Sequence, residues 1–170
     1  HMFFTILPLE GIHWDEQSIL FGCTKKEVEA KLGQPKIVKN SYYYFNNELR
    51  FDFSDTEELE FIEFLAGRNG NVQPVIYGEK AFLILADELY NILKDRNSGT
   101  LIDRESGYSF AFPNIGIGIF RESTPNDVAA LINEMKALGV NASKNPDVEE
   151  QQLKASYWAT ISLASADYSW

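Results

Sequence analysis

The chain has 170 residues, of which 15 are Lys or Arg and 25 are Asp or Glu, so its formal net charge is −10. Hydrophobic residues make up 45% and aromatic residues 14%, which is enough for a packed core and excludes intrinsic disorder. The negative charge repels phosphate and argues against a nucleic-acid-binding protein, and a single cysteine excludes an intrachain disulfide or a multi-thiolate metal site.

The first predicted element is a buried strand in the apolar run from Phe3 to Leu9, which Pro8 interrupts near its end. This run lacks the basic leader and the cleavage site of a signal peptide. No run in the chain approaches the roughly 18 apolar residues that a membrane span needs. We therefore expect a cytoplasmic protein that does not bind membranes.

The first predicted helix begins at Thr24. Thr24 and Glu27 have the spacing of a capping box, in which each side chain accepts a hydrogen bond from a free backbone N–H group at the helix start. Gly33 ends the helix and Pro35 prevents its continuation. The segment therefore predicts a short, well-bounded helix.

Three antiparallel strands are predicted next, over residues 36–45, 49–53 and 59–65. β-branched and aromatic residues fill the first, and apolar and charged residues alternate in the second. Asn46 and Asn47 predict a tight turn between these two strands, because Asn tolerates positive φ. The first 68 residues thus predict a helix followed by an antiparallel meander.

The segment from Gly67 to Pro74 has the Gly-rich and Asn-rich composition of a linker. This composition leaves two domain organisations open. In the first, residues 1–68 and 75–170 form two similar helix-plus-sheet halves, and in the second the whole chain forms one compact domain.

After this segment, helical spacing predicts a helix over residues 86–94. Residues 108–119 predict two antiparallel strands around a turn at Pro113-Asn114. Gly116 and Gly118 alternate with isoleucines in the second of these strands. We expect these glycines to lie where another backbone or an aromatic ring approaches the sheet.

Thr124, followed by a proline and an acidic first turn, begins another predicted helix. Its apolar stripe is predicted to face the core and consists of Val128, Leu131, Ile132, Met135 and Leu138. A charged helix over residues 148–154 and a strand over residues 157–163, with Trp158 in the core, complete the chain. The elements together predict an α+β fold of antiparallel sheets with packed helices.

Catalytic chemistry has few candidate residues. His13, predicted to lie in a turn, and Cys23 could meet in space as an imidazole–thiol pair, but no neighbour in the sequence activates the thiol. One such pair cannot fill a zinc site. We expect no metal and no other cofactor. An enzyme that uses carboxylates or tyrosine hydroxyls on a small molecule stays open as an alternative.

The candidate functional site is an acidic cluster beside aromatic residues. It is predicted to gather around one hairpin as a partner-binding surface made of Tyr42, Tyr43, Tyr44, Asp55, Glu57, Glu58, Glu60 and Glu63. Aromatic side chains supply interface energy, and negative charge speeds association with a basic partner. The same carboxylates also fit an ordinary solvated face, so both interpretations stay open.

Residues 22–35, GCTKKEVEAKLGQP, resemble the helix motif of small outer-membrane lipoproteins of the SmpA/OmlA type, whose helix-then-sheet unit also occurs in β-lactamase-inhibitor-like folds. The resemblance implies that a sheet follows the helix. The chain lacks the lipidated leader of those lipoproteins, so we expect a different location and role.

A longer resemblance is to the immunity proteins of bacterial polymorphic and contact-dependent toxin systems. It is carried by the segments YYYF (42–45), ELRFDF (48–53), LEFIEF (59–64), GYSF (107–110) and PNIGI (113–117). This resemblance implies a small, cytoplasmic, non-catalytic protein that binds and neutralises one cognate toxin domain, commonly a nuclease. We expect a monomer with a basic toxin domain as its partner. A self-associating structural module is the third class that stays open.

Overall fold

The computed structural model describes all 170 residues as an α+β protein with two β-sheets and four α-helices, which confirms the predicted fold class. The larger sheet has eight antiparallel strands. Their order across the sheet is β10 (Ile102–Asp103), β11 (Ser109–Phe112), β12 (Ile117–Phe120), β13 (Thr160–Ala164), β7 (Leu59–Phe64), β6 (Leu49–Phe53), β5 (Ser41–Tyr44) and β4 (Lys36–Val38). Because β13 pairs with both β12 and β7, this sheet joins strands from both sides of the predicted boundary at residues 68–75.

The smaller sheet has five strands. Their order is β3 (Gln17–Leu20), β2 (Gly11–Trp14), β1 (Met2–Leu7), β8 (Val72–Ile76) and β9 (Glu79–Lys80). β1 and β8 pair in parallel, whereas the other neighbours are antiparallel. His13, expected in a turn, therefore lies within β2.

The prediction that residues 67–74 form a linker is wrong. The segment forms a 3₁₀ turn, η1 (Gly67–Asn69), and then enters β8. Gln73 is fully buried and its side-chain amide donates to the carbonyl oxygens of Gly67 and Gly70 at 3.1 and 2.7 Å. The segment is thus a tight turn held by hydrogen bonds of the Gln73 side chain. Its Gly-rich and Asn-rich composition does not distinguish such a turn from a flexible linker.

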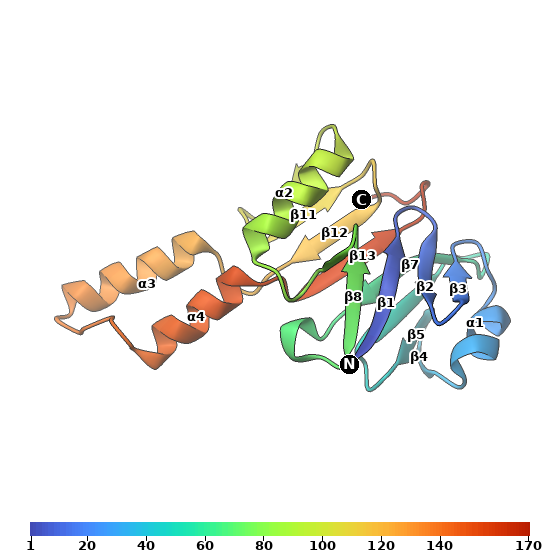
Figure 1. The fold of residues 1–170 in the computed structure, drawn as a ribbon, viewed down its shortest axis with the longest axis horizontal. Coiled ribbons are helices and arrows are strands. Elements are labelled where there is room, and N and C mark those ends of the chain that lie inside the picture. Colours follow the sequence, from blue (N-terminus) through green and yellow to red (C-terminus); the bar gives the residue numbers. More distant parts are fainter.

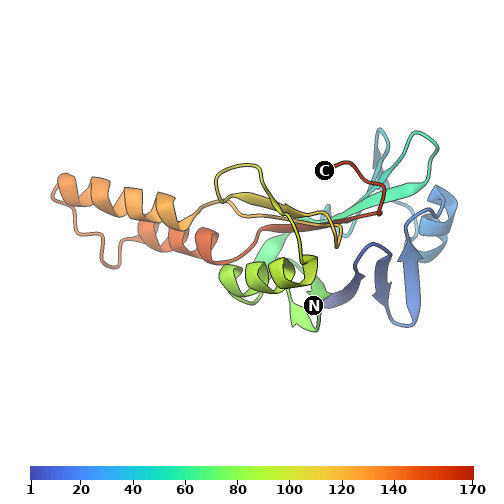
Figure 2. The ribbon, with the colours of Figure 1, turned by 90° about the horizontal axis from the view of Figure 1, so that it is seen from above.

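The core lies between the larger sheet on one side and the smaller sheet with α2 (Ala86–Asn97) on the other (Figures 1 and 2). The predicted alternation of residues 49–53 is confirmed, since Leu49, Phe51 and Phe53 are buried. The predicted strand over residues 36–45 is two strands, because Lys39 adopts a φ of 53° and turns the chain between β4 and β5.

The first helix is confirmed as α1 (Lys25–Leu32). Thr24 caps it, the side chain of Glu27 completes the capping box, and Gly33 follows with a φ of 84°. The backbone beside the N-cap also touches the larger sheet, because Thr24 forms an isolated antiparallel bridge with Glu58. α1 is thereby held next to the turn between β6 and β7.

Two further helices, α3 (Pro125–Ala137) and α4 (Pro146–Ser156), form a hairpin that projects from the body of the molecule (Figure 1). We call residues 125–156 the arm. The prediction that α3 buries its apolar stripe in the core is wrong: only Val128 of that stripe is buried, and Leu138 is 74% exposed. The reason is that α3 packs against α4 and not against a sheet.

The outer face of the larger sheet is crossed by the C-terminal residues (Figure 2). Tyr168 and Trp170 pack on Phe61, with ring centroids 5.1 and 6.3 Å away. Trp170 also lies against Gly118, which confirms the expectation that an aromatic ring approaches this glycine. Trp158 is buried, as predicted. None of the helices combines the length and apolar character that a membrane crossing requires.

Candidate functional site

The predicted tyrosine surface is not formed. Tyr42 and Tyr44 are each 5% exposed and face the core. Their hydroxyls donate to Oε2 of Glu29 at 3.0 Å and to the carbonyl oxygen of Gly33 at 2.9 Å. Alternation along β5 explains this, because it sends Tyr42 and Tyr44 inward and leaves only Tyr43 on the opposite, partly exposed face.

The predicted carboxylates separate into two groups. Asp55, Glu57 and Glu58 are exposed in the β6–β7 turn, whereas Glu60 and Glu63 lie partly buried within β7. Glu63 pairs with the Arg50 guanidinium at 3.0 Å. Burial raises the pKa of Glu63 and the Arg50 charge opposes this increase. The eight predicted residues therefore do not make one continuous patch.

The three exposed carboxylates stand on an ordered turn. Backbone N–H groups of Ser54 and Glu57 donate to the carbonyl oxygens of Glu58 and Ser54, both at 2.8 Å. The Ser54 hydroxyl accepts from the Glu58 N–H at 3.2 Å. Glu57 adopts a φ of 62°, a left-handed conformation that is rare for glutamate. The backbone of this turn is thus well ordered.

Residues of α1 lie beside this turn. The Lys25 ammonium bridges the two elements, since it reaches Glu57 Oε1 at 3.3 Å and Asn40 Oδ1 at 2.9 Å. The pKa of Tyr42 is raised by burial and also by the nearby charges of Glu29 and Glu57. We call the set of Glu29, Asp55, Glu57 and Glu58 the acidic end of the molecule. Of these four carboxylates, only Glu57 forms an ion pair, and Glu29 accepts the hydrogen bond from the Tyr42 hydroxyl.

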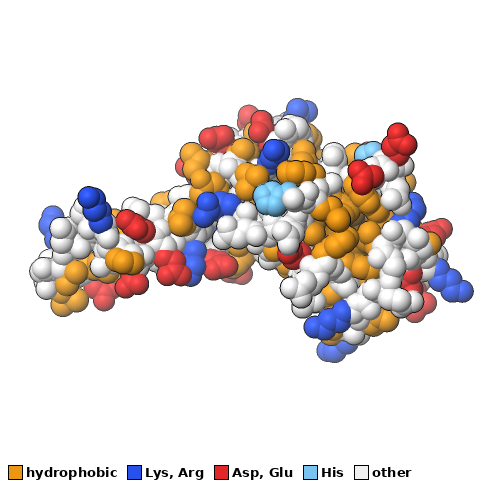
Figure 3. Space-filling model, turned by 60° about the horizontal axis from the view of Figure 1, so that its bottom comes forward, with side chains coloured by type: hydrophobic (Ala, Val, Ile, Leu, Met, Phe, Trp, Pro, Cys, Tyr) orange, Lys and Arg blue, Asp and Glu red, His pale blue; other side chains and the backbone are white.

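Negative charge is also spread elsewhere on the surface. Figure 3 shows acidic side chains along the arm and at the margins of the body, whereas hydrophobic side chains gather near the middle of that face. The acidic end is therefore one of several charged regions. Its distinction is that its carboxylates come from two elements that the Thr24–Glu58 bridge fixes to each other.

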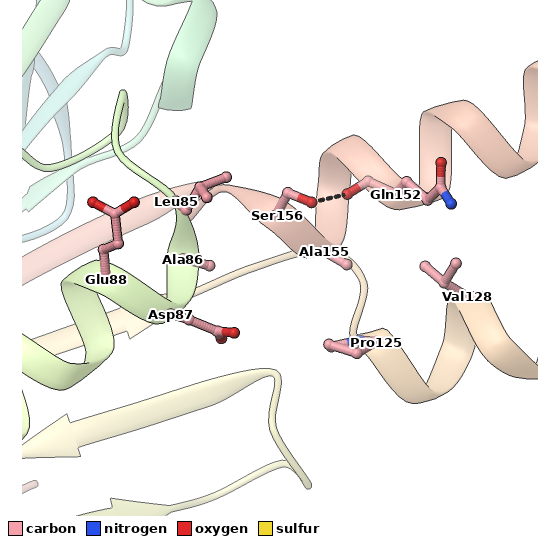
Figure 4. A pocket seen from close by; sticks show the side chains of 9 residues that line it. All are labelled: Leu85, Ala86, Asp87, Glu88, Pro125, Val128, Gln152, Ala155 and Ser156. Carbon is pink, nitrogen blue, oxygen red and sulfur yellow. Dashed lines mark hydrogen bonds between the residues drawn. The ribbon is translucent and has the colours of Figure 1, made fainter.

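A cleft of about 360 Å³ lies where the arm leaves the body (Figure 4). Its walls come from the first turn of α2, the start of α3 and the end of α4. The apolar lining residues are Leu85, Ala86, Pro125, Val128 and Ala155, and the polar ones are Asp87, Glu88, Gln152 and Ser156. Sequence reasoning missed this site because its residues lie on three helices and no local pattern joins them.

Arg121 anchors the arm beside this cleft. The residue is only 7% exposed. Its side chain donates hydrogen bonds to the carbonyl oxygens of Gly107 at 2.9 Å and Ala155 at 3.0 Å. The guanidinium also lies 4.7 Å from the ring centroid of Trp158. Burial lowers the pKa of Arg121, and the negative charge of Asp87 opposes that change.

A second hydrogen bond holds the wall of the cleft that α2 forms. The indole N–H of Trp158 donates to the carbonyl oxygen of Ala86 at 2.9 Å. Since Trp158 follows α4 directly and Ala86 begins α2, this bond joins the base of the arm to the body. The cleft walls are thus held by buried polar contacts.

The alternative Cys–His chemistry gains no support from the surroundings of the two residues. Burial and the charge of Glu27 raise the pKa of Cys23 to about 11, the opposite of what an activated nucleophile needs. The Nδ1 atom of His13 is hydrogen-bonded to the Ser18 hydroxyl at 2.9 Å. No group of three or more His, Cys, Asp or Glu side chains is arranged to hold a metal ion.

Comparison with family models, with curated proteins and with solved structures gives no match to this chain.

Proposed function

We propose that this protein is a non-catalytic immunity protein that binds and neutralises a cognate bacterial toxin domain in the cytoplasm. The toxin domain is basic, as a nuclease must be around the site that holds phosphate. The observation that carries this proposal is the acidic end, where the β6–β7 turn exposes Asp55, Glu57 and Glu58 and only Glu57 forms an ion pair.

The acidic end suits a basic partner for two physical reasons. Exposed negative charge accelerates the encounter with a positively charged surface. A turn whose backbone is already ordered loses little backbone freedom on binding, which lowers the entropic cost of the complex. The hydrogen bond that the Ser54 hydroxyl accepts from the Glu58 N–H and the left-handed conformation of Glu57 provide that backbone order here.

The test is protection of bacterial cells. A candidate toxin domain, taken from the gene beside that of this protein, is expressed with the wild type or with the variant Asp55→Asn/Glu57→Gln/Glu58→Gln. We expect the wild type to restore growth and to bind the purified toxin domain. The variant is expected to associate at least about tenfold more slowly at low salt, with a weaker salt dependence.

The matched control is Glu10→Gln/Asp95→Asn/Glu105→Gln, which removes the same charge from exposed positions on other elements. We expect this control to bind like the wild type. Equal association rates for both triple variants would remove the acidic end from the interface. Failure of the wild type to bind the toxin domain or to protect cells would refute the immunity function.

A self-associating module is a second candidate, because two apolar residues near the tip of the arm, Leu138 and Val140, are 74% and 46% exposed. Light scattering distinguishes the two candidates. The immunity protein is expected to be a monomer. A stable dimer that Leu138→Ser converts to a monomer would favour self-association.

A further inference from the structure

The cleft at the base of the arm differs in charge from the hollow on the other side of α4. Asp87 and Glu88 line the cleft and no basic side chain does. The hollow on the other side is balanced, because Arg68 and Lys154 accompany Glu122 and Glu150. The cleft is therefore an apolar-walled site with an acidic rim.

The buried charge beneath the cleft does not cancel that rim. Arg121 lies close enough to Asp87 for the Asp87 charge to raise its pKa against the effect of burial. Neither Asp87 nor Glu88 forms an ion pair, so both rim carboxylates stay available to a cation.

We propose that this cleft binds a protein segment in which a large apolar side chain stands next to a lysine or arginine. The apolar side chain fills the space between Ala86, Val128 and Ala155. The cation reaches Asp87, which points toward Pro125 in Figure 4, while Glu88 lies further out on the rim and adds to the negative charge there. Lys and Arg suit such a site, because their aliphatic stems cover apolar surface while the charged group stays near water. Binding of such a segment does not depend on the immunity function. Only the assignment of the segment to the basic toxin domain rests on that proposed function.

The size and stiffness of the cleft favour this occupant. A volume of about 360 Å³ lies within the range of pockets that enclose a ligand group. The Trp158–Ala86 hydrogen bond ties the start of α2 to the residues after α4, and the Arg121–Ala155 hydrogen bond ties the end of α4 to the segment before α3. A pocket that is already formed binds an anchoring side chain without paying for rearrangement, which is the usual setting of interface hot spots.

The test uses short synthetic peptides, so that it does not depend on the identity of the toxin. Amide spectra of the ¹⁵N-labelled protein are recorded with Leu-Arg-Leu-Lys-Leu amide and with Leu-Glu-Leu-Glu-Leu and Gly-Arg-Gly-Lys-Gly amides. We expect the first peptide to shift the signals of Asp87, Val128 and Gln152. The other two should bind at least about tenfold more weakly, because each lacks one half of the recognised chemistry.

Adjacent residues of α4 give a matched pair of variants. Gln152 and Leu153 are both exposed, but Gln152 lines this cleft and Leu153 lines the hollow on the other side. Gln152→Trp should fill the cleft and abolish the peptide-induced shifts, whereas Leu153→Trp should leave them unchanged. Glu88→Lys, on the exposed rim, should weaken binding of the basic peptide while unfolding measurements verify that each variant is folded.

Each outcome decides the proposal. Shifts confined to the cleft and lost in Gln152→Trp support it. Shifts at the acidic end instead, no shifts at millimolar peptide, or equal shifts with the acidic peptide overturn it. Concentration-dependent shifts of the cleft residues without peptide would make a second copy the occupant and also overturn it. If the peptide binds the cleft but the toxin domain is neither bound nor neutralised, the immunity function alone fails.

Discussion

The indole ring of Trp170 lies so close to Gly118 that a Cβ atom at this glycine would stand 2.9 Å from the ring atom Cζ3. The same Cβ would lie 2.6 Å from the Ser162 hydroxyl. Strand β12 therefore has no room for a side chain on its outer face at this position while the C-terminal residues are docked.

Gly118→Val is expected to displace Trp170 from the sheet and to lower the free energy of unfolding by about 1–3 kcal/mol, the usual cost of overpacking. Urea unfolding followed by tryptophan fluorescence measures both effects. The control is the same substitution in a Trp170→Ala background, where the clash with the ring is absent and the cost should be smaller. Equal costs in the two backgrounds would show that the ring does not restrict this position.

Arg121→Lys is expected to destabilise the protein by about 2 kcal/mol, because lysine cannot donate to two carbonyl oxygens and stack on an indole at the same time. Chemical denaturation gives this value. Arg96 serves as the control, since its guanidinium stacks on Tyr77 at 4.5 Å but lies on the exposed side of α2. Arg96→Lys should cost less than about 1 kcal/mol. Indistinguishable losses for both substitutions would contradict the anchoring role of Arg121.

Glu57→Gly is expected to leave stability unchanged or to raise it by up to about 1 kcal/mol, because glycine adopts positive φ without the steric cost that other residues meet. Loss of the exposed Lys25–Glu57 ion pair subtracts little from this gain. Glu58→Gly is the control, since the neighbouring residue has an ordinary φ and should lose about 0.5–1 kcal/mol. Thermal unfolding of the two variants provides the comparison, and a greater loss for Glu57→Gly would be inconsistent with strain at Glu57.

Cys23 is expected to react slowly with iodoacetamide, because its pKa of about 11 leaves it almost fully protonated near neutral pH. At pH 8 the native protein should be alkylated about 100-fold more slowly than the unfolded chain, from the ratio of thiolate populations. The raised pKa also makes the free energy of unfolding depend on pH. Between pH 9 and pH 11 the Cys23 thiol is deprotonated in the unfolded chain but still protonated in the folded protein, so stability falls as pH rises through this range. Cys23→Ala removes this part of the pH dependence. An apparent pKa of Cys23 at or below 9 would contradict the raised pKa and indicate an activated thiol.

The acidic end could be predicted only in part. Asp55, Glu57 and Glu58 were expected on the surface and are exposed there. The burial of Tyr42 and Tyr44 was missed, since a run of three tyrosines has no polar residue to indicate which face is inward. The contribution of Glu29 was also missed, because α1 meets the β6–β7 turn through a contact between residues far apart in the chain.

Local patterns in the sequence determined the elements of this protein: the capping box at Thr24 fixed the start of α1, and alternation defined β6. These features depend on neighbours within a few residues, so the chain encodes them without reference to the rest of the fold. The tertiary structure alone decided that β1 pairs in parallel with β8 and that α3 projects in an arm. An apolar helix stripe looks the same whether it packs on a sheet or on one other helix, and only the assembled chain distinguishes the two.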